Sequence, residues 1–128
     1  MAKPSVLDAS ALLALLYREP GSGILAPVLP DALLSTATLA EVHARLLLKG
    51  VDAGFAWSRL LALACEVCPL TAEQARRVGE LLPQSEFSGL SMGTLAALAL
   101  AEERRATVYT ADTACKRLPL NVEIVVLG

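Results

Sequence analysis

The chain has 128 residues, of which 55% are hydrophobic and 19% are charged, and its formal net charge is −2. This length suits one domain with a real core, and the apolar share excludes a disordered chain. It favours either a thick α/β core or extra apolar surface for a partner. The small negative charge excludes a broadly basic nucleic-acid-binding surface, so any RNA or DNA contact must come from local clusters or a metal ion. Because neither an apolar run of about 20 residues nor a cleavable signal pattern is present, we expect one cytoplasmic domain over residues 1–128, outside any membrane.

Predicted strands and helices alternate along the chain, which favours an α/β fold with a parallel sheet. A short buried strand at Val6 and Leu7 runs directly into a helix that ends near residue 16. The later strands are predicted at 32–35, 65–70, 107–110 and 122–127. The later helices are predicted at 24–29 (a short piece interrupted by Pro27), 38–49, 52–64, 71–82 and 91–105, with a loop at 83–88.

Three acids follow predicted strands, and each has an ordinary structural explanation when taken alone. Asp8 suits the cap of the first helix. Thr38 and Glu41 fit a capping box, and Arg45 lies one turn further along for an ion pair with Glu41. Asp112 follows the strand at 107–110, where it would stabilise a turn.

Together these acids indicate more. The carboxyl ends of parallel strands meet at one edge of the sheet, which is where α/β proteins bind their ligands. Asp8, Glu41 and Asp112 would repel one another there unless a divalent cation neutralised them. Oxygen ligands suit Mg²⁺ or Mn²⁺, and such an ion supports phosphodiester hydrolysis.

At these residues the chain resembles the PIN-domain family, most closely its VapC-type toxin ribonucleases. The resemblance rests on four short motifs, in this order along the chain: Val6-Leu7-Asp8-Ala9-Ser10-Ala11-Leu12, Thr38-Leu39-Ala40-Glu41-Val42, Gly89-Leu90-Ser91-Met92-Gly93 and Tyr109-Thr110-Ala111-Asp112. It implies a three-layer α/β/α domain with a central, mainly parallel sheet. It further implies RNA cleavage with Mg²⁺ or Mn²⁺, a homodimer and silencing by a VapB-type antitoxin.

The resemblance also implies site residues. Asp8, Glu41 and Asp112 would be the catalytic, metal-binding acids, and Ser10 and Thr110 would be small hydroxyl residues beside them. At Thr94 the family normally has a further Asp, so the chain departs from the pattern there. A neutral hydroxyl cannot replace a negative charge, so the departure predicts a weakened metal site. Glu86, in the preceding loop, is an alternative acid for the site.

Other candidates have plainer explanations. Cys65, Cys68 and Cys115 are expected to be free thiols, because a strand would point Cys65 and Cys68 to opposite faces and no second pair completes a zinc site. His43 is expected at a solvent-exposed or interface position. Phe55 and Trp57 suit a core, or alternatively a dimer or antitoxin surface.

The three acids predict metal-dependent phosphodiester hydrolysis, and the resemblance implies that the chain is an endoribonuclease, attenuated by Thr94. The alternative is a PIN-fold binding or assembly module with little or no catalysis.

Overall fold

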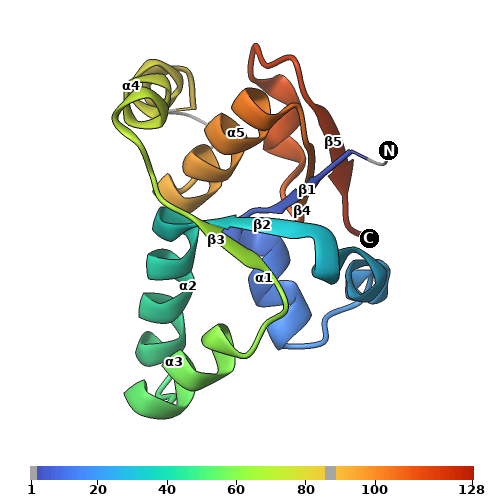
Figure 1. Ribbon diagram of the computed structural model, residues 1–128, viewed down its shortest axis with the longest axis vertical. Helices are drawn as coiled ribbons and strands as arrows, with labels where there is room; N and C mark the ends of the chain where they lie inside the picture. Colours follow the sequence, from blue (N-terminus) through green and yellow to red (C-terminus); the bar gives the residue numbers. More distant parts are fainter. Residues whose placement is uncertain (1–2, 86–88) are drawn as a thin grey trace.

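The structure is a computed structural model that describes residues 3–85 and 89–128, and its centre is a five-stranded sheet (Figure 1). All neighbouring strands pair in parallel, in the order β3-β2-β1-β4-β5. The strands are β1 (Ser5–Leu7), β2 (Ala32–Ser35), β3 (Glu66–Cys68), β4 (Thr107–Thr110) and β5 (Glu123–Val126). The predicted parallel α/β sheet is confirmed.

Helices cover both faces of this sheet, which gives the expected three layers. One face carries α1 (Ala9–Leu16), the 3₁₀ helix η1 (Ser22–Asp31), α2 (Thr36–Leu48) and α3 (Ala53–Leu61). The other carries α4 (Ala72–Leu81), α5 (Met92–Arg104) and the 3₁₀ helix η3 (Thr113–Arg117). A further 3₁₀ helix, η2 (Leu82–Ser85), follows α4.

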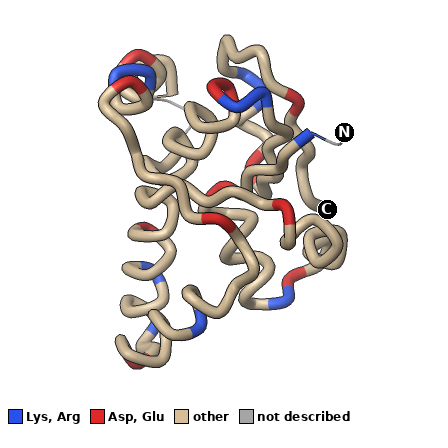
Figure 2. The backbone as a smooth tube through the Cα atoms, viewed as in Figure 1, with Lys and Arg blue, Asp and Glu red and all other residues tan. Residues whose placement is uncertain are grey.

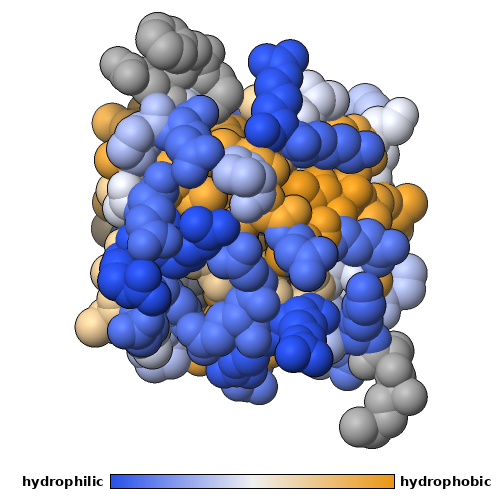
Figure 3. All heavy atoms as spheres, turned by 90° about the horizontal axis from the view of Figure 1, so that it is seen from above, coloured by the Kyte–Doolittle hydropathy of each residue, from blue (hydrophilic) through white to orange (hydrophobic). Residues whose placement is uncertain are grey.

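The central helix α5 explains much of the apolar composition. Every residue from Gly93 to Ala101 is buried, and all but two of these are Ala or Leu. A helix that is apolar on all sides belongs in the interior, and small alanines let neighbouring elements approach it closely. Seen from above, apolar side chains gather in the middle of the face over this layer, with polar side chains around them (Figure 3).

Two local predictions need correction. The predicted helix at 24–29 is a 3₁₀ helix, because Pro27 and Pro30 lie inside it and cannot donate the backbone hydrogen bonds of an α-helix. The predicted helix at 38–49 begins earlier, at Thr36, and its cap is Ser35, whose hydroxyl accepts from the Ala37 N–H at 3.2 Å. Thr38 is therefore inside the helix, and the predicted capping box with Glu41 is wrong.

The three cysteines are free thiols, as predicted. Cys68 is buried at the end of β3 and Cys65 lies just before this strand. Among the described residues, no helix is long and apolar enough to cross a membrane.

Candidate active site

The carboxyl edge of the sheet holds a cavity of about 210 Å³. It is lined by Ser10, Leu13, Glu41, Arg45, Gly89, Ser91, Thr94 and Asp112. The lining brings together α1, the middle of α2, the start of α5 and the segment after β4, on the edge where parallel topology collects the strand ends. Two of the three predicted acids, Glu41 and Asp112, thus face one cavity.

The third acid, Asp8, is completely buried between β1 and α1. Its Oδ1 accepts from the Ala11 N–H and the Ser10 hydroxyl, both at 2.8 Å. Its Oδ2 accepts from the hydroxyls of Thr110 at 2.6 Å and Thr94 at 3.0 Å. Asp8 is therefore both the cap of α1 and a neighbour of two residues that line the cavity.

Burial and hydrogen bonding act on Asp8 in opposite directions. Loss of hydration raises the pKa of this carboxyl, while hydrogen bonds from Thr110, Ala11, Ser10 and Thr94 lower it. Burial has the larger effect, so the pKa of Asp8 lies above its ordinary value.

Glu41 joins α2 to the start of α5. Its Oε1 accepts from the Gly93 N–H at 2.7 Å, and its Oε2 lies 3.2 Å from Nε of Arg45, so the expected ion pair with Arg45 is confirmed. A Cβ on Gly93 would lie 2.6 Å from Glu41 Oε1, so only glycine permits this approach. The Thr38 hydroxyl donates to the Gly93 carbonyl at 2.7 Å, which fixes α2 against α5 a second time.

Asp112 follows β4 and begins η3. Its Oδ1 accepts from the Ala114 N–H at 2.9 Å, and its own N–H donates to the Thr110 hydroxyl at 3.0 Å. The expected turn role is therefore present, and Asp112 also faces the cavity.

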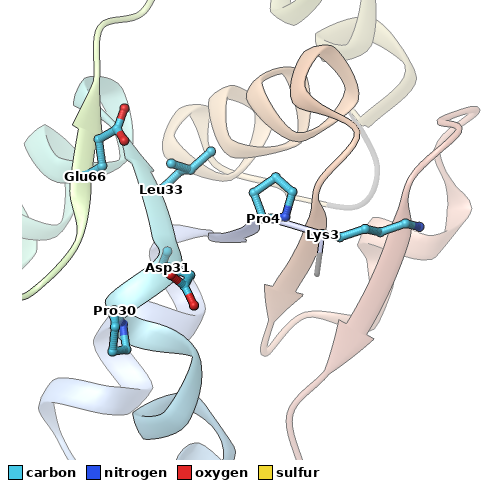
Figure 4. Close-up of a pocket in the computed structure, with 7 residues that line it drawn as sticks. Lys3, Pro4, Pro30, Asp31, Leu33 and Glu66 are labelled. Atoms are coloured by element: carbon cyan, nitrogen blue, oxygen red, sulfur yellow. The ribbon is translucent and has the colours of Figure 1, made fainter. Parts of the chain in front are cut away.

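A larger cavity, of about 500 Å³, lies at the opposite end of the strands, where Lys3, Pro4, Pro30, Asp31, Leu33 and Glu66 line it (Figure 4). The Lys3 side chain extends away from Asp31 and Glu66 there, and all three residues are exposed. The smaller cavity instead lies directly above a buried carboxylate. We therefore take the smaller cavity as the candidate active site.

The donors around the smaller cavity fit a hard divalent cation in kind, because all of them are carboxylate or hydroxyl oxygens. Only two of these oxygen ligands' side chains, Glu41 and Asp112, are carboxylates, because Asp8 is not part of the lining. Within residues 3–85 and 89–128, no group of three His, Cys, Asp or Glu side chains is arranged to hold a metal ion. The alternative acid, Glu86, lies outside the described residues. The assignment of Asp8, Glu41 and Asp112 as metal ligands stays a prediction.

Sequence reasoning did not identify two contributors to this edge. Gly93 donates its N–H to Glu41, and Thr38 donates its hydroxyl to the Gly93 carbonyl. Both residues lie in the motifs that carry the family resemblance, but the sequence assigned neither a role at the site. The available signal was that each residue shares a motif with, or lies in the motif next to, a predicted site residue.

Comparison with known proteins supplies the family. The PIN domain family matches residues 5–120. No curated protein matches the chain.

Solved structures share the fold at low identity. A chain in the Rickettsia felis VapBC2 structure, bound to a promoter DNA fragment, is 21% identical with a TM-score of 0.71, covering 97% of this chain and 98% of that one. The Mycobacterium tuberculosis toxin VapC20, described as cleaving the sarcin–ricin loop, is 19% identical with a TM-score of 0.71, covering 88% and 93%. A Mycobacterium tuberculosis VapBC-5 chain is 25% identical with a TM-score of 0.61, covering 98% and 100%.

Proposed function

Because the chain belongs to the PIN domain family, we propose that it is a metal-dependent endoribonuclease, the toxin component of a toxin–antitoxin pair. The cavity at the carboxyl edge of the sheet carries this proposal, since Glu41 and Asp112 line it and Asp8 lies beneath it. RNA as the substrate class is supported by the similarity to VapC20, a toxin that cleaves the sarcin–ricin loop.

The proposed metal is Mg²⁺ or Mn²⁺, held by Asp8, Glu41 and Asp112. Such an ion polarises a phosphate oxygen and lowers the pKa of bound water, which are the needs of phosphodiester hydrolysis. The hydroxyls of Ser10 and Thr94 add neutral oxygens at the same cavity.

Arg45 provides the positive charge at the cavity. It is half-exposed and already paired with Glu41, and a guanidinium can donate to a carboxylate and a phosphate at once. Figure 2 shows acidic and basic residues interspersed along the coloured backbone, with both signs on α4, which agrees with the formal net charge of −2. Phosphate contacts at the cavity therefore depend on local residues such as Arg45.

Thr94 supports a reduced level of activity. Its hydroxyl donates to Asp8 at the position where the family resemblance leads us to expect another acid. This bond also favours the second candidate function, a PIN-fold binding or assembly module with little or no catalysis, because Asp8 is fully hydrogen-bonded without a cation.

The proposed partner is a VapB-type antitoxin, and its proposed binding surface is the apolar face of α1, α2 and α3. A cavity of about 380 Å³ on this face is lined mainly by apolar side chains: Leu16, Tyr17, Leu46, Val51, Phe55, Ala56 and Arg59. Phe55 is 60% exposed, and large apolar side chains exposed around such a cavity are typical of a surface that binds another protein. The similarity to chains from VapBC complexes supports this partner, and we also expect a homodimer.

Cleavage of a mixed RNA pool with titrated Mn²⁺ tests the function. We expect slow, metal-dependent cleavage by the wild type and faster cleavage by Thr94→Asp. Glu41→Gln and Asp112→Asn should lose cleavage, although both keep the side-chain size and the oxygen that accepts a backbone N–H. Glu73→Gln removes an exposed acid from α4 and should behave as wild type. Absence of cleavage in both the wild type and Thr94→Asp would favour the binding module.

A further inference from the structure

The most enclosed charged group in the described chain is Asp8, and four donors surround its carboxylate. They are the Ala11 N–H and the hydroxyls of Ser10, Thr94 and Thr110. These donors come from the start of α1, the first turn of α5 and the end of β4. Asp8 therefore joins three elements that are far apart in sequence.

The hydroxyls are held in the donating direction. Ser10 Oγ accepts from the Ala111 N–H at 2.9 Å, and Thr110 Oγ1 accepts from the Asp112 N–H at 3.0 Å. Thr94 Oγ1 accepts from the Ser91 hydroxyl at 3.2 Å. Each hydroxyl oxygen thus accepts a hydrogen bond from one neighbour and donates its own hydrogen to Asp8.

The charge of Asp8 is balanced by neutral donors. Across residues 3–85 and 89–128, the ion pairs involve other acids, and none includes Asp8. Hydrogen bonds to an ionised acceptor are about twice as strong as those between neutral groups, so four of them form a substantial substitute for a cation.

We propose that the Ser10, Thr94 and Thr110 hydroxyls form a cradle that stabilises Asp8 without a metal, and that Thr94 competes with a cation for Asp8 Oδ2. The first part stands on the geometry alone. The second rests on the proposed function, because it needs a cation to enter the cavity above Thr94. The fold is then complete in the absence of metal, and Thr94 makes metal binding weaker.

Substitutions at Thr94 separate these roles. Thr94→Val keeps the shape but removes the donor, so Oδ2 retains only the Thr110 hydroxyl. Thr94→Ser keeps the donor and is the matched control. Thr94→Asp brings a second carboxylate close to Asp8, where the Thr94 hydroxyl now lies at 3.0 Å. Two such charges repel each other, and a divalent cation relieves that repulsion.

The experiment measures the thermal midpoint of the full chain in EDTA and in Mn²⁺. We expect the wild type and Thr94→Ser to melt within about 2 °C in the two conditions. In EDTA, Thr94→Val should melt about 5 °C below Thr94→Ser, because a buried carboxylate loses a donor. Mn²⁺ should raise the midpoints of Thr94→Val and Thr94→Asp by more than that of the wild type.

Two results would overturn the proposal. One is a wild-type midpoint that falls in EDTA by as much as the midpoint of Thr94→Asp. The other is equal stability of Thr94→Val and Thr94→Ser in EDTA. Neither depends on RNA cleavage, so a failure of the proposed nuclease function would leave the cradle intact and appear only in the cleavage assay.

Discussion

Glu41 is held by the Gly93 N–H as well as by the charge of Arg45, and the first contact requires that residue 93 has no side chain. The Gly93 N–H donates to Glu41 Oε1 at 2.7 Å, and a Cβ on Gly93 would lie 3.1 Å from the Glu41 Cβ and closer still to Oε1. Glu41 cannot keep its position if residue 93 carries a side chain. Gly93 is thus a positioning residue for an acid of the candidate site.

We expect Gly93→Ala to destabilise the domain although alanine is the better helix former. Loss of a hydrogen bond to a charged group costs about 1.5–3 kcal/mol, and the gain in helix propensity returns about 1 kcal/mol at most. Urea unfolding should therefore show a net loss of about 0.5–2 kcal/mol. The control is Gly79→Ala on α4, where a new Cβ meets nothing within 4 Å and a small gain is expected. Equal effects at the two glycines would contradict the proposed contact.

Cys115 offers a second test at the residue scale. Burial, with smaller contributions from Asp8 and Asp112, raises the pKa of this thiol to about 11, from an ordinary value of 9.0. A raised thiol pKa means that the contribution to stability is complete below pH 9 and is lost as the pH rises through 11, because only the unfolded chain ionises in between.

We expect two consequences of this shift. In the wild type, the free energy of unfolding should fall between pH 9 and pH 11 by more than in Cys115→Ala. At pH 8 the thiolate fraction of Cys115 should be roughly a hundredfold below that of an unperturbed thiol, so alkylation followed by mass spectrometry should find Cys115 unmodified in the folded state. A pH profile that is the same in both proteins would refute the shift.

At the scale of elements, α2 shows that a capping-box sequence can serve contacts between helices instead of a helix cap. The sequence around Thr38 and Glu41 satisfies a capping box, yet Ser35 caps the helix and both of the other side chains reach across to Gly93 on α5. A hydroxyl three residues before a glutamate is common to both arrangements. Only the packing of α2 on α5, set by the parallel sheet, decides between them.

This difference predicts separate effects for two substitutions. Ser35→Ala removes the true cap and should cost about 1 kcal/mol. Thr38→Val removes a buried donor to the Gly93 carbonyl and should cost about 1–2 kcal/mol, whereas Thr38→Ser should recover most of that loss. Denaturant unfolding measures all three. If Thr38→Val were neutral, the Thr38 hydroxyl would not be tying α2 to α5.

The order of elements and the parallel sheet were predictable because alternating apolar and helical segments specify them locally. The chain also placed Asp8, Glu41 and Asp112 near strand ends, and the structure brings Glu41 and Asp112 to one cavity. The family resemblance placed Thr94 and Thr110 at the site, but their hydrogen bonds to Asp8 were not predictable from local spacing, because these partners lie 86 and 102 residues away in sequence. Long-range hydroxyl contacts leave no local pattern.

At the scale of the whole molecule, the many apolar residues of the chain lie in two places. One is the interior, where α5 is buried on all sides. The other is the surface of α1, α2 and α3, where Leu48 on α2 is 86% exposed and Phe55 and Trp57 on α3 are also exposed. The expectation that Phe55 and Trp57 serve mainly as core residues is wrong, since they are 60% and 41% exposed. Trp57 packs edge-on against His43, at 5.2 Å between ring centroids.

The exposed apolar side chains on α2 and α3 lead to a prediction about assembly. Leu48→Ser with Phe55→Ser should change the free energy of unfolding by less than about 0.5 kcal/mol each, because both side chains are already exposed. The affinity of the same double variant for the antitoxin should fall by at least about tenfold, since apolar anchors dominate such interfaces.

Titration calorimetry with the antitoxin measures this affinity, and light scattering reports on the homodimer. Leu70→Ser, an exposed apolar position after β3, is the control that should leave antitoxin binding intact. Unchanged antitoxin affinity in the double variant would move the partner away from this face, whereas a variant that becomes monomeric but still binds antitoxin would assign the face to the second copy of the chain.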